Sequence, residues 1–184
     1  MGYAGGTKAN PTYYSLGVHS ETVQINYDPA IVSYEDLLDV FWDSHSPIIP
    51  SFSRQYASII FYHNEEQQKL AIASKEAAEA RLGTPLYTEI LPYNGFYQAE
   101  DYHQKYYLRQ YNSIMKELLA IYPDIEDLLA STAAARLNGY AGGYGDLEAL
   151  RQNITDLGLS PKSSEKLLDI AERGLVPGCA VPAA

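Results

Sequence analysis

The chain has 184 residues and a net charge of −10, which argues against binding to nucleic acid or to an anionic membrane, because both need a basic protein surface. With 46% hydrophobic residues it can bury a core, and no apolar run approaches the ~20 residues that span a bilayer. The one cysteine, Cys179, cannot form an internal disulfide, so we expect a reducing, cytoplasmic compartment.

The first residues predict a loop followed by a strand. Residues 2–20 are rich in glycine, contain an Asn-Pro pair and serine, and predict an ordered loop. Residues 22–27 alternate apolar and polar side chains, which predicts a half-buried strand with Val23, Ile25 and Tyr27 on one face. The Asp-Pro pair that follows is typical of a strand end.

Helix and strand signals then alternate. Ser33 precedes apolar residues at helical spacing, which predicts a capped helix that ends at residues 45–47. A β-branched and aromatic run at residues 56–62 predicts a central strand. Residues 64–81 predict a second helix, which begins at an asparagine cap and stops at a glycine. Residues 87–91 predict a further short strand.

The rest of the chain is expected to be helical. The tyrosine-rich segment 96–107 leads into helix, and residues 114–137 predict helix around a Tyr-Pro break. The glycine-rich residues 139–145 predict a turn. Two amphipathic helices are expected at residues 147–157 and 165–173, before a tail rich in proline and glycine.

The order of these elements predicts the fold class. Strands that alternate with helices are typical of an α/β sandwich, in which helices pack on a sheet. We expect residues 1–112 to form this core. Residues 113–184 are expected to form a helical extension with a flexible tail that holds Cys179.

Three blocks of residues carry a family resemblance. They are Gly2-Tyr-Ala-Gly-Gly6 with Asn10-Pro-Thr-Tyr13 and His19-Ser-Glu21; Phe41-Trp-Asp-Ser-His45 with Arg54-Gln-Tyr56; and Phe96-Tyr-Gln-Ala-Glu-Asp-Tyr-His-Gln-Lys-Tyr106. In this order and at this spacing, the blocks resemble the A-type peptide methionine sulfoxide reductases over about residues 2–112. The resemblance implies a two-layer α/β sandwich with a ferredoxin-like plait core, truncated at its N-terminus.

The resemblance also implies a reaction. In the family, a cysteine thiolate attacks the sulfur of methionine S-sulfoxide, free or in proteins, and a glutamic acid protonates the departing oxygen. Another cysteine resolves the sulfenic acid, and thioredoxin or a similar thiol reduces the resulting disulfide. No metal or organic cofactor is implied. No pair of the four histidines has the i, i+4 spacing of a helical metal site, so we expect packing roles for them.

Carried onto matching positions, the resemblance implies Glu21 as the proton donor. It implies Tyr13, Tyr56 and Tyr106 as the hydroxyls around the sulfoxide oxygen. A sulfoxide oxygen leaves poorly unless it is protonated, and phenol hydroxyls are neutral donors that attract less water than a charge would. From the residues alone, Glu21 could instead be a solvated surface carboxylate and the tyrosines could be core aromatics.

The sequence departs from the family pattern in two places. The family's Gly-Cys-Phe-Trp block, which supplies the nucleophile, would lie upstream of residue 1, so the attacking cysteine is absent from this sequence. Met1 stands where relatives often carry valine, and we hypothesise that the gene model starts at an internal valine codon. Ser51 stands where the family commonly has an aspartate.

Two functions are consistent with these residues. The first is a peptide-methionine (S)-S-oxide reductase, in which Cys179 would be a resolving thiol on a mobile tail. The alternative is a catalytically inactive, truncated homologue that binds methionine sulfoxide or a partner protein, in which Cys179 would be an ordinary tail thiol.

Overall fold

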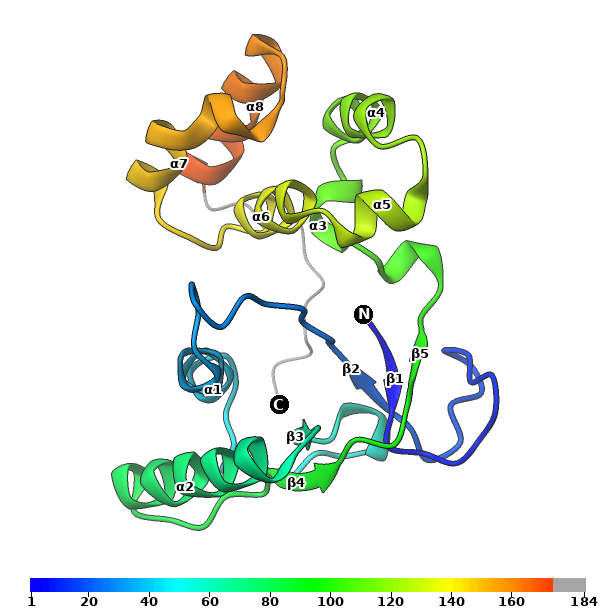
Figure 1. The fold of residues 1–184 in the computed structure, drawn as a ribbon, viewed down its shortest axis with the longest axis vertical. Helices are drawn as coiled ribbons and strands as arrows, with labels where there is room; N and C mark the ends of the chain where they lie inside the picture. The colour runs from blue at the N-terminus through cyan, green and yellow to red at the C-terminus, as the bar shows by residue number, and fades with distance from the viewer. Residues whose placement is uncertain (174–184) are drawn as a thin grey trace. The chain divides into compact units, whose positions relative to one another are not determined.

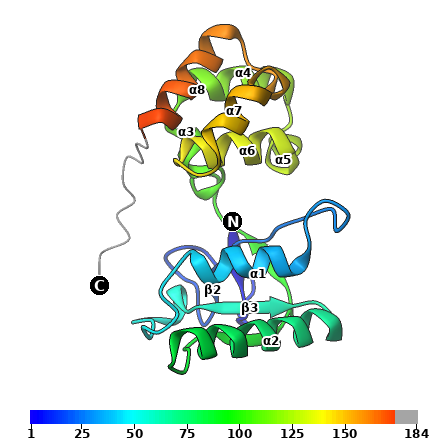
Figure 2. The same cartoon turned by 90° about the vertical axis from the view of Figure 1, so that its left-hand side faces the viewer.

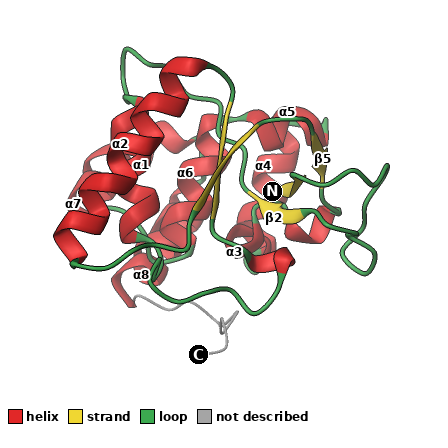
Figure 3. Cartoon of the chain, turned by 90° about the horizontal axis from the view of Figure 1, so that it is seen from below, coloured by secondary structure: helices red, strands yellow, loops and turns green. Residues whose placement is uncertain are grey.

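The computed structural model describes residues 1–173, which fall into two compact units that divide between Glu100 and Asp101. The first unit mixes strands and helices, and the second is helical (Figure 1). The strands, yellow in Figure 3, make up a small part of the chain. Within residues 1–173, no helix has both the length and the apolar character that crossing a membrane requires. The boundary expected at residues 112 and 113 stays a prediction.

The strands of the first unit form two small sheets. They are β1 (Gly2–Ala4), β2 (Ser20–Thr22), β3 (Ile59–Tyr62), β4 (Glu89–Pro92) and β5 (Phe96–Gln98). One sheet has the order β2-β1-β5 with antiparallel neighbours, and in the other β3 pairs with β4 in parallel. Parallel neighbours need a crossover connection, which here is the helix α2 (Glu65–Leu82).

The prediction of a loop at residues 2–20 is wrong at its start, where the chain forms the central strand β1. Gly2, Tyr3 and Ala4 are all buried, because β2 and β5 pair with this strand on its two sides. A side chain on Gly2 would collide with the ring of Phe96 and the backbone of Tyr97. The glycine therefore permits a close approach of two strands rather than a turn.

The predicted strand at residues 22–27 is also wrong beyond its first residue. β2 ends at Thr22, and Val23 and Ile25 are 66% and 55% exposed. Thr22 lies opposite Gly2 in the β1–β2 register, so among the described residues no strand continues alongside the residues after Thr22. An alternating pattern cannot form a strand without a partner that satisfies its backbone.

The two helices of the first unit begin where the sequence predicts. In α1 (Tyr34–Asp43), Ser33 and Asp36 form a reciprocal capping box, and in α2 the Asn64 side chain accepts from the backbone of Gln67. Side chains from both helices and from β3 form one buried cluster. The cluster consists of Leu38, Trp42, Ile60, Ala71, Ala78 and Leu86. A short 3-10 turn, η1 (Arg54–Tyr56), precedes β3, which is shorter than the predicted strand at residues 56–62.

The second unit gathers short helices around one apolar core (Figure 2). They are η2 (Asp101–His103), α3 (Tyr106–Arg109), α4 (Asn112–Ile121), α5 (Ile125–Ala130), α6 (Thr132–Ala141), α7 (Leu147–Asn153), η3 (Ile154–Leu157) and α8 (Pro161–Arg173). The core contains fully buried Leu108, Leu118 and Leu137. The turn expected at residues 139–145 is wrong at its start, because α6 continues through Gly139 to Ala141.

Candidate active site

Strand β2 carries Glu21 to the edge of the first sheet. Glu21 lies opposite Tyr3 in the register, while its neighbour Ser20 points into the interior and is 1% exposed. The Ser20 hydroxyl donates to the backbone carbonyl of Arg54 at 2.6 Å. This bond fixes β2 beside η1, although the two elements are more than thirty positions apart in the chain.

One side chain links Glu21 to two predicted tyrosines. The Nε2 of Gln55 donates to the Oε1 of Glu21 at 2.6 Å and to the hydroxyl of Tyr56 at 3.2 Å. The Tyr56 hydroxyl in turn lies 3.3 Å from the hydroxyl of Tyr13. The structure therefore brings Glu21, Tyr56 and Tyr13 into one hydrogen-bonded set, which we call the carboxyl–phenol cluster.

The loop that carries Tyr13 is anchored by a carboxylate at the end of the same unit. The backbone N–H of Tyr13 donates to Glu100 Oε1 at 3.0 Å. The hydroxyl of the buried Tyr3 donates to the other oxygen of Glu100 at 2.6 Å. Glu100 thus connects the Tyr13 loop to the central strand β1 and fixes the position of the Tyr13 backbone.

A buried histidine closes the same loop. His19 is 2% exposed and accepts from the backbone N–H of Gly6 at Nδ1, at 3.0 Å. The ring proton is therefore on Nε2, which donates to the carbonyl of Lys8 at 2.9 Å. The Lys8 side chain donates to the carbonyl of Ser15 at 2.8 Å. These bonds give an irregular loop a fixed shape, as a binding residue such as Tyr13 needs.

Exposed aromatic rings border the carboxyl–phenol cluster. Phe52 is 81% exposed, and its ring centroid lies 5.3 Å from that of Tyr56. Tyr14 is 91% exposed and meets Tyr13 edge to face at 5.3 Å. The cluster therefore has an apolar, solvent-facing rim. Ser51, at the place of the family's aspartate, donates to the carbonyl of Ser53 at 2.7 Å.

Two predicted site residues lie outside the first unit. Tyr106 begins α3 in the second unit, directly after Lys105, which has a left-handed backbone (φ 47°). Burial lowers the pKa of the Lys105 ammonium group. The roles of Tyr106 and Cys179 stay predictions, and Cys179 lies outside the described residues.

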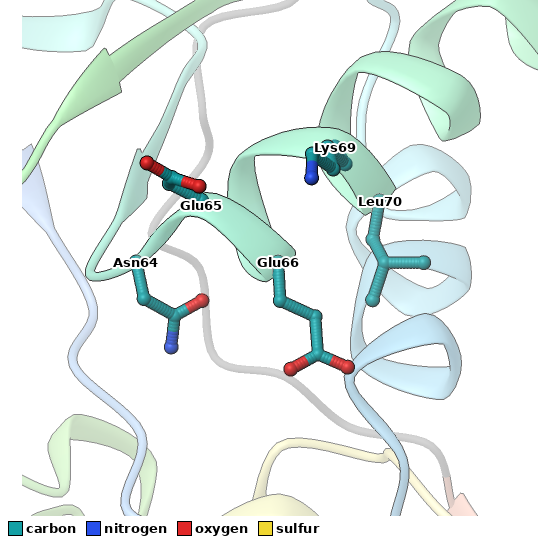
Figure 4. A pocket seen from close by; sticks show the side chains of 5 residues that line it. All are labelled: Asn64, Glu65, Glu66, Lys69 and Leu70. Carbon is teal, nitrogen blue, oxygen red and sulfur yellow. The ribbon is translucent and has the colours of Figure 1, made fainter.

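A surface hollow lies apart from these residues. It has a volume of about 640 Å³ and lies at the start of α2, between Asn64 and Leu70 (Figure 4). The carboxylates of Glu65 and Glu66 point away from each other there, and both lie where acidic residues complement a helix dipole. Within residues 1–173, no group of three or more His, Cys, Asp or Glu side chains could hold a metal ion.

Sequence reasoning assigned no role to Gln55 or Glu100. Both lie inside the blocks that carry the resemblance, and Gln55 directly precedes the predicted site residue Tyr56. Their partners, Glu21 and Tyr13, are 34 and 87 positions away in the chain. Their place in these blocks is the signal that the sequence offers, and it does not indicate which partner each side chain binds.

Comparisons with known proteins agree with the sequence motifs. A family model for peptide methionine sulfoxide reductase matches residues 1–135, and one for the helical domain of selenoprotein methionine sulfoxide reductase A matches residues 124–172. A peptide methionine sulfoxide reductase from Drosophila melanogaster is 42% identical over 163 residues, which are 88% of this chain and 65% of that protein. Peptide methionine sulfoxide reductase MsrA from Methanosarcina acetivorans is 47% identical over 118 residues, which are 58% of this chain and 63% of that protein.

A solved structure shares the fold. The crystal structure of Mxr1 from Saccharomyces cerevisiae in reduced form matches with a TM-score of 0.55 and 28% identity, over 60% of this chain and 69% of that one. The chain spans less than two thirds of the length of the curated relatives named above. The matched models, the identities and the shared mixed α/β fold with a helical C-terminal domain lead to one conclusion: the chain belongs to the peptide methionine sulfoxide reductase family.

Proposed function

We propose that the protein is a peptide-methionine (S)-S-oxide reductase and that the carboxyl–phenol cluster binds the oxygen of the sulfoxide. The observation that carries the proposal is a series of hydrogen bonds: the Gln55 amide joins Glu21 to Tyr56, and the Tyr56 hydroxyl bonds to that of Tyr13. A sulfoxide oxygen only accepts hydrogen bonds, and a carboxylic acid beside two phenols offers it O–H donors.

The proposed reaction assigns Glu21 to proton transfer. A cysteine thiolate attacks the sulfur while Glu21 gives its proton to the oxygen. The products are the methionine thioether and a cysteine sulfenic acid, which keeps the oxygen. A second thiol converts the sulfenic acid to a disulfide with loss of water, and a thioredoxin-type dithiol reduces that disulfide.

The described residues supply binding and proton donation in this proposal. They contain no cysteine, and Cys179 is the one cysteine of the sequence, so these 184 residues do not supply separate attacking and resolving thiols. We assign Tyr106 to the same oxygen and Cys179 to the resolving step, both from the family resemblance. A thiol reductant implies a reducing compartment, for which we propose the cytoplasm.

The finer fold is also a proposal. We infer a plait-like two-layer sandwich over residues 1–112, with residues 113–184 as a helical extension. The inference is supported by the β3–α2–β4 crossover and by the packing of α1 and α2 around one apolar cluster.

The alternative is a homologue that binds methionine sulfoxide without reducing it. It is favoured by the cysteine count, since Cys179 is the one cysteine in the sequence. Removal of a nucleophile abolishes most of the rate of a covalent mechanism, while binding can persist.

A paired assay tests the proposal and separates it from the alternative. Peptides with the S or the R sulfoxide are titrated into the protein and then incubated with dithiothreitol, using wild type, Cys179→Ser and Glu21→Gln. We expect binding of the S epimer in preference to R, and loss of any turnover in both variants. Binding without turnover in the wild type supports the alternative. Turnover that persists in Cys179→Ser contradicts the thiol mechanism, and equal binding of both epimers contradicts the proposed site.

A further inference from the structure

The Gln55 amide makes two of the bonds that join the carboxyl–phenol cluster, but Gln55 itself has no role in the proposed reaction. Its nitrogen carries two hydrogens, and the two acceptors, Glu21 Oε1 at 2.6 Å and the Tyr56 hydroxyl at 3.2 Å, can take one each. The shorter of the two bonds goes to the carboxyl oxygen. Gln55 therefore spans the acid and a phenol of the carboxyl–phenol cluster.

The second bond has a directional consequence for Tyr56. Because the Tyr56 oxygen accepts from Gln55, its own O–H proton must be directed away from the amide. The hydroxyl of Tyr13 lies 3.3 Å from the Tyr56 oxygen and can accept this proton, and an acceptor ligand bound beside Tyr56 can accept it in the same way. Gln55 thus orients Tyr56 as a donor, which suits an S=O oxygen and disfavours a hydroxyl or amine donor.

The backbone around Gln55 is held in place independently of its side chain. Ser20 donates to the carbonyl of Arg54, and the Ala57 N–H donates to the same carbonyl at 3.2 Å. The Arg54 guanidinium pairs with Glu89. A change at the Gln55 side chain therefore alters the amide bonds and leaves the η1 backbone supported.

We propose that Gln55 is a positioning residue that fixes the spacing of the Glu21 carboxyl and the Tyr56 hydroxyl and thereby sets the preference for the S epimer. The inference rests on the proposed function, because the ligand is the same sulfoxide oxygen. A site distinguishes the two epimers of a sulfoxide by fixing where the oxygen lies relative to the other substituents of the sulfur. A fixed spacing of the carboxyl and the phenol defines that position of the oxygen, so it converts affinity into stereoselectivity.

The test compares Gln55→Met, which keeps the length of the side chain, with Gln152→Met. Gln152 is a matched control because its Nε2 also donates to a glutamate, Glu148 Oε1, at 3.3 Å. Affinities for S- and R-methionine sulfoxide peptides are measured by calorimetry. We expect Gln55→Met to lower the S-over-R ratio about tenfold, and Gln152→Met to leave it unchanged. A loss of structure alone would weaken both epimers equally.

A second readout needs no ligand. The carboxyl carbon signal of Glu21 and the ring signals of Tyr56 are recorded by NMR in the wild type and both variants. The inference predicts that both signals shift in Gln55→Met and stay in place in Gln152→Met. If they do not shift in Gln55→Met, or if its S-over-R ratio equals that of the wild type, the positioning role is overturned.

The two readouts separate the inference from the proposed function. If the wild type binds neither epimer, the proposed function is contradicted. If the NMR signals still shift in Gln55→Met in that case, Gln55 remains the residue that arranges the cluster. Gln55→Asn, whose amide is one methylene too short to span both groups, provides the same comparison if the methionine variant does not fold.

Discussion

Gly6 lies where the buried His19 leaves no room for a side chain. A Cβ on Gly6 would be 2.6 Å from His19 Cγ and 2.7 Å from the His19 backbone nitrogen. His19 cannot move aside without breaking its bonds to Gly6 and Lys8. The conformation of the Tyr13 loop therefore depends on a glycine at position 6.

We predict that Gly6→Ala lowers the free energy of unfolding by about 1–3 kcal/mol and weakens binding of the S-sulfoxide peptide, because overpacking displaces His19 and the loop it closes. Urea denaturation measures the first effect and calorimetry the second. Gly139→Ala is the control, since Gly139 has open space around it within α6, and it should stabilise by about 0.5–1 kcal/mol. Equal stabilities of Gly6→Ala and wild type would contradict the packing account.

The residues of the site differ in how far the sequence predicts them. Glu21, Tyr13 and Tyr56 follow from a family resemblance, and the structure joins them by hydrogen bonds while their roles stay proposals. Gln55 and Glu100 were given no role, because their partners lie 34 and 87 positions away in the chain. Local pattern carries no information about contacts at that separation.

At the scale of elements, one carboxylate joins two helices of the second unit. Glu117 on α4 accepts from the hydroxyl of Ser163 at 2.6 Å, and from the hydroxyl and backbone N–H of Ser160 at 2.7 and 2.9 Å. These donors, with Ser163 first, hold the pKa of the Glu117 carboxyl below its ordinary range. The bonds connect α4 to the start of α8.

This arrangement predicts a pH dependence that Glu117→Gln removes. A carboxyl group whose pKa is lower in the folded than in the unfolded state stabilises the fold at pH values above its unfolded-state pKa. This contribution to stability is lost as the pH falls through the folded-state pKa. We expect Glu117→Gln to be less stable than the wild type at pH 7 and the difference to shrink toward pH 3. Urea midpoints at several pH values measure this, with the exposed Glu165→Gln on α8 as control. A difference that stays constant with pH would refute the coupling.

The elements also show where sequence patterns suffice. Helix starts at Ser33 and Asn64, and the stop at Gly83 with φ 69°, are confirmed because a cap satisfies backbone groups with residues a few positions away. Strands were predicted less well. The run at residues 22–27 has the alternation of a strand but no neighbour beyond Thr22, whereas the glycine-rich β1 is a strand because it has neighbours on both sides.

At the scale of the whole molecule, the folds of the two units can be predicted from the sequence to different extents. The helical character of the second unit follows from local periodicity, and its short helices share one apolar core. The mixed α/β character of the first unit follows from the alternation of elements, but its two separate sheets depend on pairings between distant strands. The family models overlap at residues 124–135, within the second unit.

The central claim for the molecule is that side chains from separate segments act as one acceptor-binding site. A double-mutant cycle of Tyr13→Phe and Tyr56→Phe on the affinity for the S-sulfoxide peptide tests it directly, because two hydroxyls that bind one oxygen cannot contribute independently. The account predicts that the double variant loses less affinity than the sum of the single losses, with a coupling above about 0.5 kcal/mol. Additive losses, or single variants that bind like the wild type, would contradict it.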